Sequence, residues 1–318
     1  MLPFNYSVAI RTLGTAGEKY QQLLNSLSKQ TIPPKGIYVY IAEGYPIPKE
    51  TINVETYIYV QKGMLAQRAL DYSEIDSEFI LFLDDDLVLP PDAVESMYTL
   101  LNKYEGDVIS PDIYNNASRG RLAELLMILS GRMIPRKDDG RWGYKVMRNG
   151  GYSYNKTPMR NVYESNTNAG ACFLCRKKDF IKINLKDELW IDSMPYPLGE
   201  DQITYYKMFK KGLKVLTCYN HCIIHMDGGN SMNPQKEKTR LYGDIFFKVV
   251  FWHRFIYQQE KLLMERLVDC LAIGYYIFFS LLVSLVKLRF DVLLVKLEAL
   301  KKGVSFIKSV EYKSLPRI

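Results

Sequence analysis

One stretch constrains the fold more than any other: five apolar residues, Phe79–Leu83, run directly into three carboxylates, Asp84–Asp86. An unbroken apolar run of this length predicts a strand that is buried on both faces, as in a parallel sheet. Pro90–Asp92 follows and suits the beginning of a helix. Because ligands of open α/β sheets bind at the carboxyl ends of strands, this stretch predicts a binding site. A solvated acidic turn is the alternative.

The three adjacent carboxylates also predict a cofactor. Neighbouring anions repel one another, and a bound cation removes that repulsion. Carboxylate oxygens are the ligands that hard divalent ions prefer. We therefore expect Mg²⁺ or Mn²⁺ at this site.

The surrounding residues alternate between strand and helix patterns. Strands are expected at 6–11, 36–42, 55–60 and 107–110, and helices at 15–27, 63–72 and 91–104. This order predicts an α/β nucleotide-binding half-sheet with right-handed crossovers. Neither a G-x-G-x-x-G segment after the first strand nor a P-loop is present, so dinucleotide-binding and P-loop NTPase functions lose support.

Residues 113–165 show no such alternation apart from one apolar helical piece at 122–129, and we expect an irregular insertion over the site. Order then returns. A small-residue strand is expected at 169–175, a loop up to Gly199, a helix from Glu200 to Gly212, and strands at 213–217 and 221–225.

The C-terminal part has a different character. Residues 270–286 carry no charge, which is 17 residues and short of the roughly 20 that span a bilayer comfortably. Residues 290–300 follow with apolar side chains at helical spacing and Lys or Arg between them, the pattern of a helix at a membrane interface. We expect a catalytic domain at 1–235 and a membrane-associating tail at 236–318. Helices packed on the domain or on a partner subunit are the alternative.

Charge supports a membrane partner. The net charge is +7, and from Lys287 onward eight Lys or Arg stand against three Asp or Glu, so most of the excess lies in the tail. This favours an anionic membrane surface, contacted through 267–302, over nucleic acid. Segment 267–288 either spans the membrane or lies on it. The N-terminus lacks signal-peptide regions and the five cysteines are odd in number, so the expected location is the cytosolic membrane face.

A second carboxylate pair, Glu200 and Asp201, stands at the beginning of a predicted helix. A helix N-terminus stabilises a carboxylate by ~0.3–1 kcal/mol, so a base placed there is expected to be ionised at neutral pH. Ordinary helix capping is the alternative. The combination with the Asp84–Asp86 cluster and with His225 favours a catalytic role.

The order of these motifs resembles the glycosyltransferase A fold and, within it, the family-2 glycosyltransferases, over residues 6–230. The matching segments are Ser7–Thr12 with Leu24–Thr31, Gly63–Arg68, Asp84–Asp86 as a D-x-D motif, Gly170–Arg176, Gly199–Asp201 as an E-D motif, and His225–Ser231 as H-x-x-G-G-x-S. The resemblance implies an α/β fold with a mixed, mostly parallel sheet flanked by helices. It also implies inverting transfer of a glycosyl group from a nucleotide-diphosphate sugar to a hydroxyl of a glycan or lipid-linked acceptor.

The resemblance further implies roles for individual residues. Asp84, Asp86 and His225 would hold the divalent ion on the diphosphate, and the ion would help the leaving group depart. Asp201, with Glu200 beside it, would act as general base on the acceptor hydroxyl.

The donor would be held by Thr12 and Glu43 near the base, Arg68 at the phosphates, and Asp84 or Asp85 near the ribose. The sequence departs from the family pattern at three places, all near the base-recognition contacts. Arg11 stands where proline is usual, Ala42–Gly44 replaces Asp-Asp-Gly, and Ala69 replaces an asparagine.

Three alternatives have other sequence support. Cys172, Cys175, Cys218, His221, Cys222 and His225 offer zinc ligands, although Cys172–Cys175 lacks the glycine turn of a zinc knuckle. A sugar-phosphate nucleotidyltransferase would require a Gly-rich loop after the first strand, of which Leu13–Gly17 is a poor version. A non-catalytic membrane scaffold would not need the intact acidic motifs.

Overall fold

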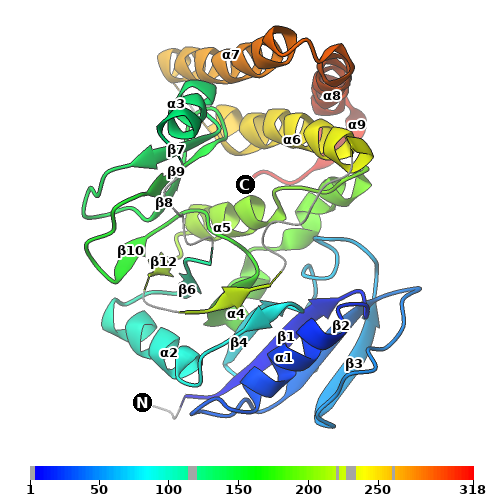
Figure 1. Ribbon diagram of the computed structural model, residues 1–318, viewed down its shortest axis with the longest axis vertical. Helices are drawn as coiled ribbons and strands as arrows, with labels where there is room; N and C mark the ends of the chain where they lie inside the picture. Colours follow the sequence, from blue (N-terminus) through cyan, green and yellow to red (C-terminus); the bar gives the residue numbers. More distant parts are fainter. Residues whose placement is uncertain (1–3, 114–119, 220–221, 227–233, 260–261) are drawn as a thin grey trace.

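A large mixed sheet forms the centre of the protein (Figure 1), in a computed structural model that describes residues 4–113, 120–219, 222–226, 234–259 and 262–318. Its strands are β1 (Tyr6–Thr12), β2 (Ile37–Ala42), β3 (Glu55–Val60), β4 (Phe79–Asp84), β6 (Val108–Pro111), β10 (Val162–Glu164), β11 (Cys172–Arg176) and β12 (Val215–Cys218). They are ordered β10-β12-β6-β11-β4-β1-β2-β3. The pairs β1–β2, β1–β4, β2–β3 and β6–β12 are parallel, while β10 and β11 run antiparallel to their neighbours. The predicted fold class is confirmed.

Strand β4 is buried on both faces, as its apolar run predicts. Phe79, Leu81 and Leu83 belong to one apolar core, and Ile80 and Phe82 to a second core on the other face of the sheet. Helices α1 (Glu18–Leu27) and α2 (Ala93–Lys103) cover the first face and confirm the helices expected there. The carboxylates that follow β4 therefore lie at the edge of a sheet with a core on each side.

Two expectations between the strands are wrong. The helix expected at 63–72 is a series of turns, in which the carboxylate of Asp192 accepts hydrogen bonds from the amides of Leu65 (3.0 Å) and Ala66 (2.8 Å). The loop expected before Gly199 contains two helical segments, α4 (Lys177–Lys182) and the 3₁₀ segment η1 (Leu185–Ser193). Contacts between residues that are distant in sequence determine the conformation of both segments.

In the 113–165 insertion the helical piece expected at 122–129 is confirmed, but the rest is not irregular as expected. The insertion contains α3 (Arg121–Ser130) and a small sheet of order β7-β9-β8, formed by β7 (Met133–Arg136), β8 (Tyr144–Val146) and β9 (Tyr152–Asn155). These strands are short and pair with one another in a sheet of their own. No apolar run in the sequence marks them. Strand β10 then joins the main sheet.

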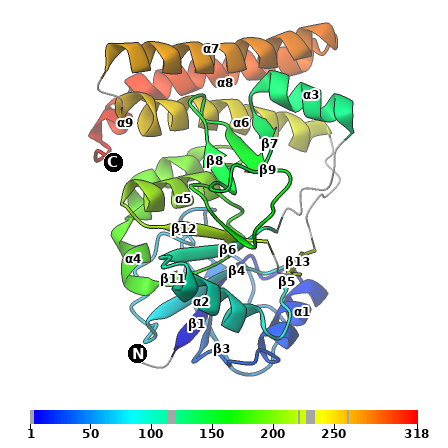
Figure 2. The ribbon, with the colours of Figure 1, turned by 90° about the vertical axis from the view of Figure 1, so that its left-hand side faces the viewer.

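The C-terminal helices stack against the opposite end of the molecule from α1 and β3 (Figures 1 and 2). They are α6 (Pro234–Phe255), α7 (Leu263–Val286), α8 (Phe290–Lys308) and the short α9 (Val310–Ser314), and α5 (Glu200–Lys210) precedes them in the chain. The remaining short elements are the strands β5 (Leu87–Val88) and β13 (Ile224–His225) and the 3₁₀ turn η2 (Tyr257–Gln259). Phe247 and Phe251 of α6 and Tyr312 of α9 lie in the same apolar core as Phe82 of the sheet. The tail residues thus share a core with the predicted catalytic domain.

Helix α7 is long and apolar enough to cross a membrane, with a mean hydropathy of 1.9 in its most apolar window. Only 22% of that window is buried in the molecule. Along its inner side, however, α7 makes polar contacts with the body: Asp269 accepts from Arg148 (3.0 Å), and the Tyr276 hydroxyl donates to Asp244 (3.1 Å). Its outer side is apolar and exposed.

Candidate functional site

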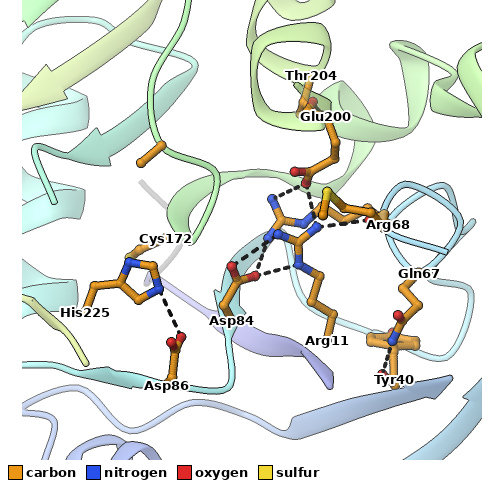
Figure 3. Close-up of polar contacts among 12 residues, drawn as sticks. Arg11, Tyr40, Gln67, Arg68, Asp84, Asp86, Cys172, Glu200, Thr204 and His225 are labelled. Atoms are coloured by element: carbon orange, nitrogen blue, oxygen red, sulfur yellow. Dashed lines mark hydrogen bonds and ion pairs between the residues drawn. The ribbon is translucent and has the colours of Figure 1, made fainter. Parts of the chain in front are cut away.

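The site begins where β1 and β4 end side by side. In their parallel register Arg11 stands opposite Asp84. The Arg11 guanidinium donates to both carboxylate oxygens of Asp84, at 2.6 and 3.1 Å (Figure 3). Such a bidentate pair fixes both side chains in orientation as well as in distance.

Glu200, the first residue of α5, joins this pair from the other side. It accepts from Arg11 at 2.6 Å and lies 3.3 Å from Arg68, which also donates to Asp84 at 3.0 Å. We call Arg11, Arg68, Asp84 and Glu200 the quartet; its formal charges cancel. Burial alone would raise the pKa of both carboxyls, but the two guanidiniums hold the pKa of Asp84 and of Glu200 below their ordinary values.

Asp201 follows Glu200 in α5, and its pKa is shifted in the opposite direction. Burial, and then the charge of Glu200, raise its pKa well above the ordinary range. Its Oδ1 is buried without a hydrogen-bond partner, and a Cβ at Gly170 would lie 2.0 Å from it. The pKa of Asp201 is thus shifted in the direction opposite to the one predicted from the helix N-terminus, because burial and the charge of Glu200 outweigh that effect.

Asp85 points back toward β1, where it accepts a hydrogen bond from the Thr12 hydroxyl. The Thr12 hydroxyl in turn accepts from the amide of Gly14 (2.8 Å). The backbone carbonyl of Thr12 accepts from the side-chain amide of Gln67 (3.0 Å). Burial raises the pKa of Asp85 to about 6. Thr12 and Asp85 are thus brought together, as expected for residues at one binding site.

Asp86 and His225 form a second, separate contact. The pairing of β13 with β5 places His225 Nε2 3.2 Å from Asp86 Oδ1 (Figure 3). A carboxylate and an imidazole are donors that Mn²⁺ accepts, so this pair fits the predicted divalent ion. Asp84 points away from them toward the guanidiniums, and among the described residues no group of three His, Cys, Asp or Glu side chains is arranged to hold a metal. Besides Asp86 and His225, the ion would therefore need further ligands, such as the oxygens of a bound diphosphate.

A cavity of about 790 Å³ connects these groups. Its wall includes five of the predicted site residues, Thr12, Asp84–Asp86 and His225, together with Arg11. Asp192, which sequence reasoning missed, also lines it and holds the turn that leads to Arg68. Gly63 has to be glycine there, because a Cβ would lie 2.3 Å from Asp192 Oδ2. We call this space the first cavity.

Four predicted residues are not among those that line the first cavity: Glu43, Arg68, Glu200 and Asp201. Arg68 and Glu200 are buried in the quartet, so the contact predicted between Arg68 and a phosphate stays a prediction. Glu43 is exposed, and its assignment to the nucleoside base also stays a prediction. Asp201 lines another cavity, of about 440 Å³. Glu200 therefore belongs to the quartet, whereas Asp201, the next residue, lines this second cavity.

The zinc alternative gains nothing from the described part of the chain. Cys172, Cys175 and Cys218 are buried free thiols, and Cys222 is exposed. Burial raises the pKa of Cys172 and Cys175, which disfavours the thiolate that zinc requires. His221, and residues 227–231 of the H-x-x-G-G-x-S segment, lie outside the described residues.

Comparison with solved structures gives the fold. A structure titled GalNAc-T7 with UDP, GalNAc and Mn²⁺ is 12% identical, with a TM-score of 0.50, and the match covers 87% of this chain and 55% of that one. TarS of S. aureus is 13% identical with a TM-score of 0.47, covering 86% of this chain and 43% of that one. A structure of S. aureus TarS 1–349 is 15% identical with a TM-score of 0.47, covering 86% and 70%. This chain thus spans about half the length of the first two.

Sequence comparison gives the family. No curated protein sequence matches the chain. The family model described as glycosyl transferase family 2 matches residues 57–183, from β3 through the Asp84–Asp86 cluster to α4. Residues 57–183 of this chain thus match glycosyltransferase family 2, and the fold is that of the glycosyltransferase A enzymes.

Proposed function

We propose that this protein is an inverting glycosyltransferase that moves a sugar from a nucleotide-diphosphate sugar in the first cavity to an acceptor hydroxyl in the second. The observation that carries the proposal is the placement of Glu200 and Asp201. One carboxylate belongs to the quartet that also holds Asp84, and the next lines the second cavity. A donor and an acceptor bound in the two cavities would meet at these residues.

The first cavity suits the donor. Lys19 and Lys62 line it and supply positive charge for a diphosphate. Asp86 and His225 would hold a Mg²⁺ or Mn²⁺ ion, and GalNAc-T7 carries Mn²⁺ with UDP in its solved structure. When bound, the ion would neutralise the charge that develops on the leaving nucleoside diphosphate.

The second cavity suits the acceptor. In the transfer step a bond forms between the acceptor oxygen and the anomeric carbon while the bond to the diphosphate breaks on the opposite face. Asp201 takes the proton of the acceptor hydroxyl, and the diphosphate leaves with the bonding electron pair. Because burial raises the pKa of Asp201, the carboxyl has to lose a proton before each transfer, and the guanidiniums of Arg11 and Arg68 favour that ionisation.

We also propose that the protein binds a membrane through the outer faces of α3 and α7, at the cytosolic side. Exposed apolar side chains gather there, including Leu125 and Leu126 of α3 and Leu271 and Phe278 of α7. The contacts of α7 with the body favour a helix that lies on the membrane over one that spans it.

Replacing Asp201 with Asn tests the proposal. We expect transfer, measured as released nucleoside diphosphate in a screen of nucleotide sugars with Mn²⁺, to fall by at least about 1,000-fold while donor binding by calorimetry stays within about twofold. In the unchanged protein, transfer should decline with acidification well above pH 4, because the base has a raised pKa. NMR of the product should show the inverted anomer. Near-normal turnover of Asp201→Asn would refute the assignment.

A further inference from the structure

The second cavity carries more positive charge than a neutral sugar acceptor needs. Its wall is formed by α3, the β7-β9-β8 sheet, the start of α5 and one side of α6, of which the last two lie outside the segment that matches the family. Three cations line it, Arg132, Arg240 and Lys248, against Asp244 and Asp201. Burial raises the pKa of Asp201, which favours its uncharged form.

Among the residues that the structure describes, one of these three cations forms an ion pair within the cavity. Arg132 forms an ion pair with Asp244 at 3.2 Å. Lys248, 4% exposed, donates to the carbonyl of Gly150 at 2.5 Å and has no carboxylate within ion-pair distance among the described residues. The Nε of Arg240 is buried without a hydrogen-bond partner. A buried donor left unpaired destabilises the protein, and a bound anion would offset that cost.

The cavity also adjoins the apolar surface. Met127 and Ser130 of α3 line it, while Leu122, Leu125 and Leu126 of the same helix are exposed. The Tyr275 hydroxyl of α7 donates to the carbonyl of Leu129 at 2.6 Å, which joins α3 to α7 in one surface (Figure 2). An anionic group in the cavity could therefore belong to a molecule whose apolar part lies along α3 and α7.

We propose that the acceptor carries a phosphoryl group, and that this group binds between Arg240 and Lys248 in the second cavity. The proposal rests on the proposed function, since it assigns the acceptor of that reaction. The phosphoryl oxygens accept from the guanidinium and the ammonium, and the hydroxyl to be glycosylated then lies toward Asp201. The neighbouring apolar surface suits a phosphorylated lipid, and a soluble sugar phosphate has the same recognised group.

Calorimetric titration of the full chain in neutral dodecyl maltoside micelles tests this, with dodecyl phosphate and glucose 1-phosphate as probes. We expect Arg240→Gln and Lys248→Gln each to weaken dodecyl phosphate binding about tenfold, which is about 1.4 kcal/mol. Arg240→Lys, which keeps the charge, should retain most of the affinity and shows that loss in Arg240→Gln is not misfolding. Arg121→Gln removes an exposed charge at the start of α3, outside the cavity, and should change the affinity less than about twofold.

The two probes distinguish the sources of the phosphoryl group. Binding of dodecyl phosphate alone indicates a lipid acceptor, and equal binding of glucose 1-phosphate indicates a soluble one; either result supports the site if Arg240→Gln weakens it. The proposal is overturned if neither probe binds, or if Arg121→Gln weakens binding as much as Arg240→Gln does. Nucleoside diphosphate binding with Mn²⁺ is measured on the same samples. Its loss would contradict the proposed donor site, whereas intact nucleotide binding without phosphate binding would contradict only this inference.

Discussion

Arg11 occupies the centre of the quartet, at a position where the family pattern has proline. It donates to Asp84 and to Glu200, and through them it links β4 to α5. Removing one partner from a buried group of charges leaves its counter-ions unpaired, at a cost of about 3–5 kcal/mol for a buried pair. Arg68 still contacts both carboxylates, so the expected cost lies at the lower end of this range.

We therefore expect Arg11→Met to lower the free energy of unfolding in urea at pH 7 by about 3 kcal/mol. Arg11→Lys keeps the charge but cannot donate to Asp84 in the same bidentate geometry, and should lose less than half as much. A loss below about 1 kcal/mol in Arg11→Met would mean that Arg68 alone holds the two carboxylates.

Lys248 gives a pH-dependent prediction. Burial lowers its pKa to about 8, while Asp244 raises it and Arg132 lowers it further; the rings of Phe247 and Tyr276 also face the ammonium. A lowered lysine pKa means that the unfolded chain binds more protons between pH 8 and about 10.5, so stability rises with pH across this window. The destabilisation from the buried charge is fully present below pH 8.

Lys248→Met removes that charge. The stability of the variant relative to the unchanged protein should fall by about 2–3 kcal/mol between pH 7 and pH 10.5, because only the unchanged protein gains from deprotonation. Denaturation curves of both proteins at the two pH values check this. An equal difference at both values would show that Lys248 keeps an ordinary pKa.

At the scale of elements, the beginning of α5 depends on Gly199. This residue has φ 84°, and a Cβ there would lie 2.2 Å from the ring of Phe247 in α6. Gly212, just after the same helix, has φ 82° but no atom within 4 Å of such a Cβ. The two glycines thus separate backbone strain from steric overlap.

Gly212→Ala is expected to cost about 1–2 kcal/mol of stability, the price of a left-handed backbone for a residue with a side chain. Gly199→Ala adds the overlap with Phe247 and should cost about 3 kcal/mol or more in thermal or urea unfolding. Trimming the ring in Gly199→Ala/Phe247→Leu should recover part of the difference. Equal losses in the two single variants would contradict the packing of α5 on α6.

The same elements show what a sequence can predict. The apolar run of β4, its carboxylates and the Glu200–Asp201 helix start were all predicted, because each has a local pattern. The role of Asp192 was not, since it accepts from amides 126 and 127 positions away. The sequence likewise marks Arg11 as unusual but does not reveal its contact with Glu200, 189 positions away. Asp201 was placed correctly at a helix start, but its protonation depends on burial.

At the scale of the whole molecule, the tail has an inner face that packs on the folded body and an outer face that is exposed. Its inner face belongs to the folded body: Tyr312 of α9 lies in the second core, and Arg254 of α6 donates to Glu188 and to the carbonyl of Pro316. Deleting residues 267–318 would therefore remove core contacts together with any membrane contact. Substitutions on the outer face of α7 separate the two effects.

Leu271 and Phe278 are 73% and 63% exposed on that outer face. We expect Leu271→Glu/Phe278→Glu to reduce the fraction of protein that floats with vesicles of phosphatidylcholine and phosphatidylglycerol by at least about fivefold, because two charges replace apolar area at the interface. Its thermal stability should hardly change, since surface substitutions cost within about 0.5 kcal/mol. Val54→Glu, an equally exposed apolar position beside β3 at the other end of the molecule, is the matched control and should float like the unchanged protein. If both variants float equally well, the α3 and α7 surface is not what holds the protein on the membrane, and its apolar side chains serve another contact.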